Sequence, residues 1–258
     1  MSDVTFTKRG KLSAAVVALV AVLGIAGYAL VGNGGSDAHS APTRAVRPVA
    51  TTTTTAAGQT FRAATTKPGG IPVYAAPDNQ SAPTTTLSPQ TEYLVPRTVL
   101  AFGQQGDWLH VFLPTRPNAS TAWVKATDVT VSAPLERTVK VSLAEHKVWV
   151  LRNGTVELTA DAAIGTPDNP TPTGTFYITD PVDLRSDPNT AYGVYALGLS
   201  GHSDTLSEFN GGDAQIAIHG TNEPGAIGKN VSHGCVRVQN DVILKLAALP
   251  LGTPVFIS

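Results

Sequence analysis

Residues 216–240, IAIHGTNEPGAIGKNVSHGCVRVQN, place the strongest constraint on how this chain can fold. Apolar residues lie at both ends of the stretch, at 216–218 and at Val236 and Val238, so each end is predicted as a short buried strand. The residues between them are polar and interrupted by glycines, which permit turns that other residues adopt only at a cost. The sequence therefore predicts a loop that leaves one β-strand and returns beside another.

This stretch also carries the candidate catalytic groups. Cys235 is the only cysteine of the chain, and His219 and His233 are two of its six histidines. A thiol and a histidine that is distant in sequence but close in space suffice for nucleophilic catalysis, because the imidazole accepts the proton and the thiolate attacks. Gly234 lies directly before the cysteine, where it lets backbone N–H groups turn toward an oxyanion. The pattern predicts a cysteine nucleophile.

Other interpretations of these residues stay open. A single cysteine is often a small buried apolar residue, although such a residue has no need of a flanking histidine and glycine. His219, His233 and Cys235 are also three possible zinc ligands. The sequence has no Cys-x-x-Cys or His-Glu-x-x-His spacing and no second cysteine to resolve an oxidised thiol. The pattern favours thiol catalysis, and no metal or cofactor is predicted.

Residues 232–237, SHGCVR, together with His219 upstream and Asn240 downstream, resemble the signature of the L,D-transpeptidases, the cysteine enzymes that cross-link peptidoglycan. The interval between the histidine and the cysteine falls in the range of that family. The segment 171–176, TPTGTF, resembles the strand-entry motif of the family. The resemblance covers residues 137–258 and implies a β-sandwich-like catalytic domain.

The resemblance implies a reaction on peptidoglycan stem peptides. Cys235 would attack the carbonyl between the diamino acid and the terminal D-Ala of a donor tetrapeptide. D-Ala would leave, and an acceptor amine of a neighbouring stem would resolve the thioester into a 3→3 cross-link. Release by water, as in an L,D-carboxypeptidase, or by a protein amine, which attaches a protein to the wall, is the alternative. A non-catalytic wall-binding protein is a more distant one. Covalent inhibition by β-lactams of the carbapenem class is also implied.

The resemblance also implies roles for residues around the cysteine. His219 is the predicted general base, and the main-chain carbonyl of Gly220 is predicted to orient its ring. Backbone N–H groups of Gly234 and Cys235 are predicted to stabilise the oxyanion. The supporting polar residues are His233 and Ser232. The candidate substrate-binding residues are Arg237, Asn240 and His202, and a structural ion pair is the alternative for Arg237.

The N-terminus predicts a membrane anchor. Residues 1–12 carry three cations and precede residues 13–31, a segment of 19 residues without a charge. As a helix this segment is roughly 28 Å long, about the thickness of the hydrocarbon core of a bilayer. Residues 1–12 are therefore predicted to be cytoplasmic, residues 13–32 to be a single-pass anchor, and the rest to be extracytoplasmic, in the periplasm or cell wall. A cleavable signal peptide is the alternative.

Two segments separate the anchor from the catalytic domain. Residues 33–69 are rich in Thr, Ala and Pro and have almost no large apolar side chains, which predicts a disordered linker. Residues 70–132 contain about five short strand-like runs, typical of a small barrel. The stretches 106–109, GDWL, and 113–118, LPTRPN, resemble bacterial SH3-like modules. Only 14% of the residues are charged and the net charge is −1, so no nucleic-acid partner is predicted.

The catalytic domain is predicted to be mostly β, with one short helix. Several runs in residues 137–258 alternate apolar and polar side chains. The helix is predicted to have Asn240 as its N-cap and residues 241–249 as its body. The glycine-rich and polar segment 199–214 is predicted to be a loop over the active site. The complete fold expected is a transmembrane helix, a small SH3-like barrel and a β-sandwich-like domain.

Overall fold

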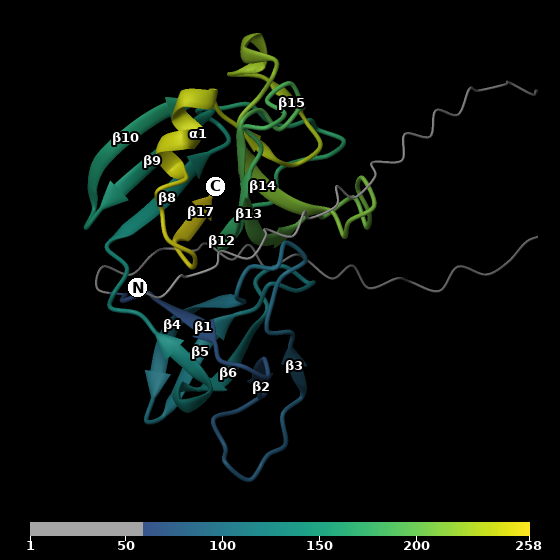
Figure 1. The fold of residues 1–258 in the computed structure, drawn as a ribbon. Coiled ribbons are helices and arrows are strands. Elements are labelled where there is room, and N and C mark those ends of the chain that lie inside the picture. Colours follow the sequence, from purple (N-terminus) through teal and green to yellow (C-terminus); the bar gives the residue numbers. More distant parts are fainter. Residues whose placement is uncertain (1–58) are drawn as a thin grey trace, which may run out of the picture. The chain divides into compact units, whose positions relative to one another are not determined.

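A small antiparallel sheet forms the first part of the computed structural model, which describes residues 59–258 (Figure 1). The strand order is β6-β5-β4-β1-β7, and β2 pairs with β3. Leu100, Val111 and Val124 are fully buried in one hydrophobic core. The elements of this first module are β1 (Arg62–Thr66), β2 (Ile71–Val73), β3 (Thr85–Leu87), β4 (Thr98–Gln105), β5 (Trp108–Phe112), β6 (Thr121–Lys125), the 3-10 turn η1 (Ala126–Asp128) and β7 (Val129–Val131).

Strand β1 corrects the predicted linker. It lies within the segment 33–69, yet it pairs with β4 on one side and β7 on the other. Phe61, Ala63 and Ala64 are buried in the core of the module. The prediction was wrong here because it required large apolar side chains, whereas small alanines fit a strand that is packed between two neighbours. The first module therefore begins before residue 70.

The remaining N-terminal predictions are not addressed by the structure. The cytoplasmic N-terminus at 1–12, the anchor at 13–32 and most of the linker lie outside the described residues. Between residues 59 and 258 no helix is long and apolar enough to span a membrane. The resemblance of the first module to SH3-like barrels stays a prediction.

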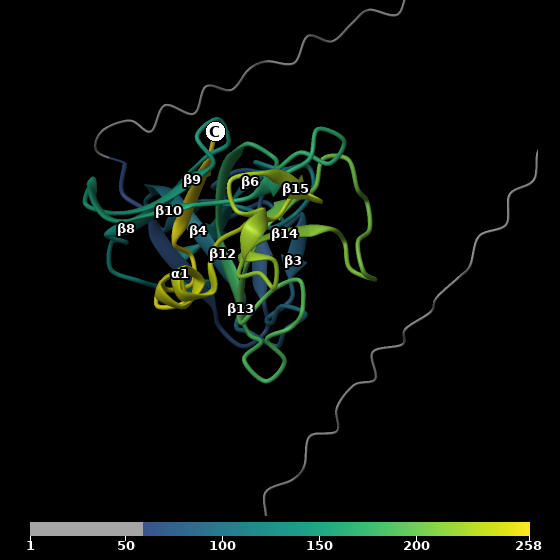
Figure 2. The ribbon, with the colours of Figure 1, turned by 90° about the horizontal axis from the view of Figure 1, so that it is seen from above.

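The second part of the chain is built on an eight-stranded sheet in the order β10-β9-β8-β17-β12-β13-β14-β16. Strand β12 joins its two halves, because the first residues of β12 pair with β17 and the last ones with β13. In both views β8–β10 and β14 lie on opposite sides of β12 (Figure 2). The strands are β8 (Arg137–Ser142), β9 (Lys147–Arg152), β10 (Thr155–Asp161), β12 (Gly174–Asp183), β13 (Tyr195–His202), β14 (Gln215–His219), β16 (Val236–Arg237) and β17 (Pro254–Ile257), with a further parallel pair of β11 (Ile164–Gly165) and β15 (Asn230–Ser232).

Both halves of this sheet share one hydrophobic core. Val139 and Val148 from one half and Leu197 and Ile216 from the other are almost fully buried in the same cluster. Inner faces that meet across a common core are the arrangement of a β-sandwich. The structure thus confirms the mostly β, sandwich-like class that was predicted for this domain.

One α-helix, α1 (Asn240–Leu246), occurs in residues 59–258, along with a second 3-10 turn, η2 (Pro224–Ala226). Ile243 and Leu246, spaced by three residues, are buried in the core of the domain as the pattern predicts. The predicted cap was wrong, because Asn240 is the first helical residue and Gln239 takes the cap position without a side-chain hydrogen bond.

The predicted loop over the active site is shorter than expected. Strand β13 continues to His202, and the loop occupies residues 203–214, before β14 begins. We call residues 203–214 the covering loop. Residue 201 in this strand is a glycine, and any larger residue there would collide with the ring of Phe176.

Candidate active site

The two predicted catalytic residues lie at the ends of neighbouring strands. β14 ends at His219, and β16 begins directly after Cys235. These strands pair in parallel, with Ile218 opposite Val236, so the loop between them crosses over before the second strand begins. Paired strands are about 4.8 Å apart. The pairing therefore brings the histidine and the cysteine to the same cavity, as the sequence predicts.

Cys235 lines two cavities. The smaller one, of about 80 Å³, is also lined by His219, His233 and Arg237. The larger one, of about 520 Å³, extends from Cys235 to Asp213. Residues that line both cavities are Tyr192, Phe209, Asn210, Ala214, Gln215 and Ile216.

His219 is held as a neutral, buried ring. Only 3% of its surface is exposed, and its Nδ1 lies 2.6 Å from the Gly220 carbonyl oxygen. Because a carbonyl only accepts hydrogen bonds, Nδ1 of the neutral ring carries the hydrogen and the lone pair lies on Nε2. Burial lowers the pKa of His219 to about 4. The Arg237 guanidinium acts in the same direction, while hydrogen bonds to the Gly220 and Tyr192 carbonyls oppose the decrease. At neutral pH the resting ring is therefore unprotonated.

The Cys235 thiol is protonated at rest. The residue is a free cysteine of intermediate exposure, and burial of its thiol raises the pKa above the ordinary value. A backbone hydrogen bond with Ala217 and the Arg237 guanidinium act in the opposite direction. Within residues 59–258 no hydrogen bond joins the His219 ring to this thiol. The two groups thus rest as neutral imidazole and thiol, not as a preformed ion pair.

Ser232 fixes the backbone around the cysteine. Its hydroxyl donates to the Cys235 carbonyl oxygen at 2.6 Å and accepts from the Gly234 N–H at 3.2 Å. Gly234 has a φ of +117°, which favours glycine. The Gly234 N–H is therefore already bonded in the resting site, and its predicted place in the oxyanion site stays a prediction. The Cys235 N–H has no hydrogen-bond acceptor within residues 59–258, so it is the backbone donor that is available there.

Residues 136–257 match the family model described as the L,D-transpeptidase catalytic domain, YkuD. YqjB of Bacillus subtilis (strain 168), which is named for an L,D-transpeptidase activity, is 30% identical over 131 residues, and the match covers 46% of this chain and 70% of that protein. This chain belongs to the L,D-transpeptidase family. YkuD of the same organism, named for the same activity, is 35% identical over 121 residues, which cover 46% of this chain.

The matches to known proteins cover only part of each chain. The chain spans 65% of the length of YkuD. A solved structure, L,D-transpeptidase 3 from Mycobacterium tuberculosis in complex with a faropenem-derived adduct, is 15% identical and gives a TM-score of 0.40 over 63% of this chain and 91% of that one. Membership of the family rests on the sequence matches and not on this overlap. The family predicted for residues 137–258 is thereby confirmed.

Asn240 was predicted to bind substrate, but its side chain is bonded to the backbone of Thr221. Its side-chain oxygen accepts from the Thr221 N–H at 3.0 Å, and its amide donates to the Thr221 carbonyl at 3.0 Å. A side chain at Gly193 or Gly220 would lie within about 2.2 Å of that oxygen. Asn240 therefore holds the chain that follows His219, and it does not line either of the Cys235 cavities.

The other two candidate substrate-binding residues, Arg237 and His202, line different cavities. Arg237 lines the smaller Cys235 cavity and pairs with the exposed carboxylate of Glu223 at 3.4 Å. His202 is buried, and its Nε2 lies 2.8 Å from an Asp213 oxygen. It lines a third cavity that does not include Cys235, so its predicted contact with substrate at the thiol is not supported.

His233 and an unpredicted tyrosine complete the rim of the site. The His233 ring lies 5.1 Å from the ring of Phe209 in the covering loop. The Tyr192 ring lies 4.8 Å from that of His219, and no pattern in the sequence distinguishes this tyrosine from a strand residue. In the described part of the chain, no three His, Cys, Asp or Glu side chains are grouped as metal ligands.

Proposed function

We propose that this chain is a peptidoglycan L,D-transpeptidase that forms 3→3 cross-links through a thioester on Cys235. The donor is a tetrapeptide stem ending in D-Ala, and the acceptor is the side-chain amine of a neighbouring stem. Family membership supports the class of chemistry. The observation that carries the proposal is the position of a protonated thiol and a buried neutral imidazole on one cavity.

The first half-reaction forms the thioester. Nε2 of His219 takes the thiol proton as the Cys235 sulfur attacks the carbonyl carbon of the donor. The oxyanion accepts a hydrogen bond from the Cys235 N–H, and His233 lies at the rim of the site. The tetrahedral intermediate collapses, the bond to the D-Ala nitrogen breaks, and His219 returns the proton to the departing amine.

The second half-reaction forms the cross-link. The acceptor amine attacks the thioester carbonyl, and His219 takes a proton from the attacking nitrogen. The carbon–sulfur bond breaks, an amide forms, and the sulfur of Cys235 regains a proton. Arg237 lies on the smaller cavity, where its cation suits a carboxylate of the peptide.

Other products of the same thioester are a carboxypeptidase product, formed by water, and a protein attached to the wall. Purified disaccharide tetrapeptides separate these outcomes by mass spectrometry. Cross-linked dimers that lack one D-Ala support the proposal, whereas tripeptides alone indicate hydrolysis. A wild-type protein that consumes no donor, like the Cys235→Ala control, would indicate a non-catalytic wall-binding protein.

We further propose that residues 13–32 anchor the protein in the cell membrane and that the catalytic domain is extracytoplasmic, in the periplasm or wall. The charge pattern of the sequence supports this orientation. A reporter fused after Ser258 that works only outside the cytoplasm is the expected result, and a reporter active only in the cytoplasm would overturn the orientation.

A further inference from the structure

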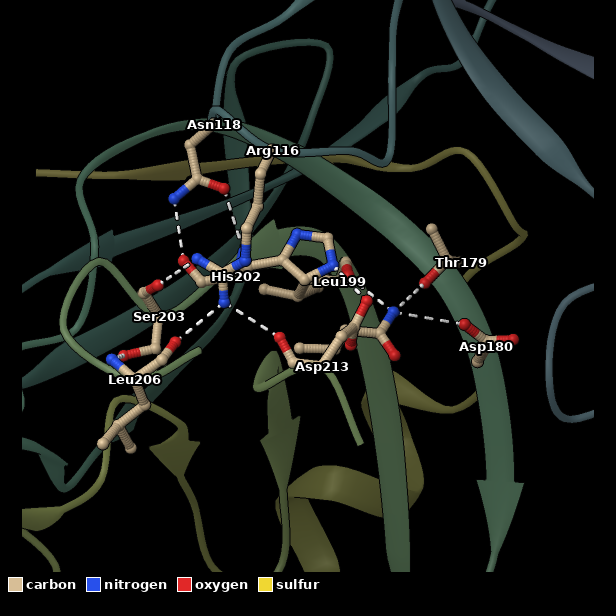
Figure 3. A network of polar contacts seen from close by, with 10 residues as sticks. Arg116, Asn118, Thr179, Asp180, Leu199, His202, Ser203, Leu206 and Asp213 are labelled. Carbon is tan, nitrogen blue, oxygen red and sulfur yellow. Dashed lines mark hydrogen bonds and ion pairs between the residues drawn. The ribbon is translucent and has the colours of Figure 1, made fainter. Parts of the chain in front are cut away.

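One arginine of the first module holds the covering loop by hydrogen bonds (Figure 3). Arg116 lies in the connection between β5 and β6. Its guanidinium donates to three main-chain carbonyls, those of Ser203 at 2.6 Å, Leu206 at 2.8 Å and Asp213 at 2.9 Å. These carbonyls lie at the start and near the end of the covering loop. A guanidinium is planar and carries several fixed donors, so it can bind several carbonyls at once. Arg116 therefore connects both ends of the loop to the first module.

Asn118 makes a second set of hydrogen bonds next to those of Arg116. Its side-chain oxygen accepts from the His202 N–H at 2.9 Å, and its amide donates to the His202 carbonyl at 2.7 Å and to an Asp204 oxygen at 3.0 Å. The side chain thus bonds the last residue of β13 as a neighbouring strand would. The His202 ring in turn bonds Asp213, so the two ends of the covering loop are also joined to each other.

The held loop forms part of the wall around the nucleophile. Leu206, Phe209 and Asn210 of the covering loop line the smaller cavity together with Cys235. The contact between the Phe209 and His233 rings joins the loop to the segment that carries the thiol. A shift of the loop would therefore change the shape of the site at the reacting sulfur.

The first module also reaches the larger cavity directly. Glu92 and Tyr93, in the connection between β3 and β4, line the same 520 Å³ space as Cys235. A substrate bound at the thiol within this space would lie against residues of the first module. The two parts of the chain thus contribute to one cavity.

We propose that Arg116 and Asn118 are positioning residues for the reaction at Cys235, and that the first module is a working part of the substrate site. Both side chains hold the covering loop in the place where it shapes the cavity. The nature of the substrate rests on the proposed function, whereas the grip on the loop does not. Misplacement of a substrate by about 1 Å can cost about 10²-fold in rate, so loss of the grip is expected to act on turnover.

Substitutions at Arg116 in the full-length protein test this proposal. In Arg116→Ala, hydrogen exchange of the amides at 203–214 should become faster, and kcat/KM for the tetrapeptide donor should fall by about 10²-fold. Arg116→Lys should resemble it, because one ammonium keeps the charge but not the fork. Alkylation of Cys235 by iodoacetamide, a small reagent, should stay within about threefold of the wild type, which a general loss of structure would not allow.

Two further variants make the test specific. Asn118→Ala removes fewer hydrogen bonds and should give a smaller change of the same kind. Arg62→Ala is the matched control, because Arg62 lies in the same module and makes no hydrogen bond or ion pair through its side chain in residues 59–258. The control should leave both exchange and turnover unchanged.

Several results would overturn the proposal. Unchanged exchange in Arg116→Ala would show that the arginine does not hold the loop, and faster exchange with kcat/KM within about twofold would show that the loop does not matter to the reaction. If the wild type turns over no donor, the proposed function fails separately. The grip is then tested by the ratio of alkylation rates with a bulky maleimide and iodoacetamide. This ratio should rise about tenfold in Arg116→Ala, and an unchanged ratio overturns the proposal.

Discussion

Acid should destabilise this protein through His219. The pKa of the ring is about 4 in the folded protein, compared with an ordinary value of 6.5. Between these values the unfolded chain binds a proton that the folded protein does not, so the free energy of unfolding decreases as the pH falls. The contribution is fully present above about pH 6.5 and is lost by about pH 4. A difference of about 2.5 pKa units corresponds to roughly 3 kcal/mol, most of which is lost between about pH 7.5 and about pH 4.5.

Urea unfolding of the wild type and of His219→Asn measures this contribution. The amide of asparagine keeps a donor close to the position of Nδ1, which bonds Gly220, but it does not titrate. All other titrating groups are common to both proteins, so their effects cancel in the comparison. Between about pH 7.5 and about pH 4.5 the wild type should lose roughly 2.5 kcal/mol more than the variant. Equal losses would refute the assignment of His219 as a buried neutral base.

Three other predictions follow from the site. A carbapenem should add once to the intact mass of the wild type, at Cys235, and an adduct of equal mass in Cys235→Ala would argue against the thiol. Asn240→Ala should lower the free energy of unfolding by about 1–3 kcal/mol, because both bonded groups of Thr221 lose their partner, as denaturant midpoints would reveal. His233→Ala should lower turnover by about 10²-fold and His219→Ala by more, and the reverse order in kcat would make His233 the base.

The sequence predicts the local parts of the site well. The polar loop between two apolar runs predicts that His219 and Cys235 meet, and the parallel pairing of β14 with β16 brings both to one cavity. The i, i+3 spacing of Ile243 and Leu246 likewise predicts the buried face of α1. Such features depend on residues that are near one another in the sequence, so their pattern carries the information.

Features that depend on tertiary packing were not predictable. Asn240 has the residue type of a helix cap, and only the fold shows that its side chain instead holds Thr221. Alanines at 63 and 64 carry no strong strand signal, and their burial depends on the neighbouring strands β4 and β7. The reach of Arg116 to Ser203 joins residues 87 positions apart, which no local pattern specifies.

The proposed thioester on Cys235 is the central step of the proposed mechanism, and intact mass spectrometry tests it directly. Full-length protein incubated with a donor tetrapeptide and no acceptor should gain the mass of the donor less D-Ala. Peptide mapping should place this group on Cys235, and hydroxylamine, which cleaves thioesters, should remove it. His219→Ala should acquire the group more slowly, and Cys235→Ala should not acquire it at all. Release of D-Ala by Cys235→Ala, or an acyl group mapped to another residue, would contradict the proposed mechanism.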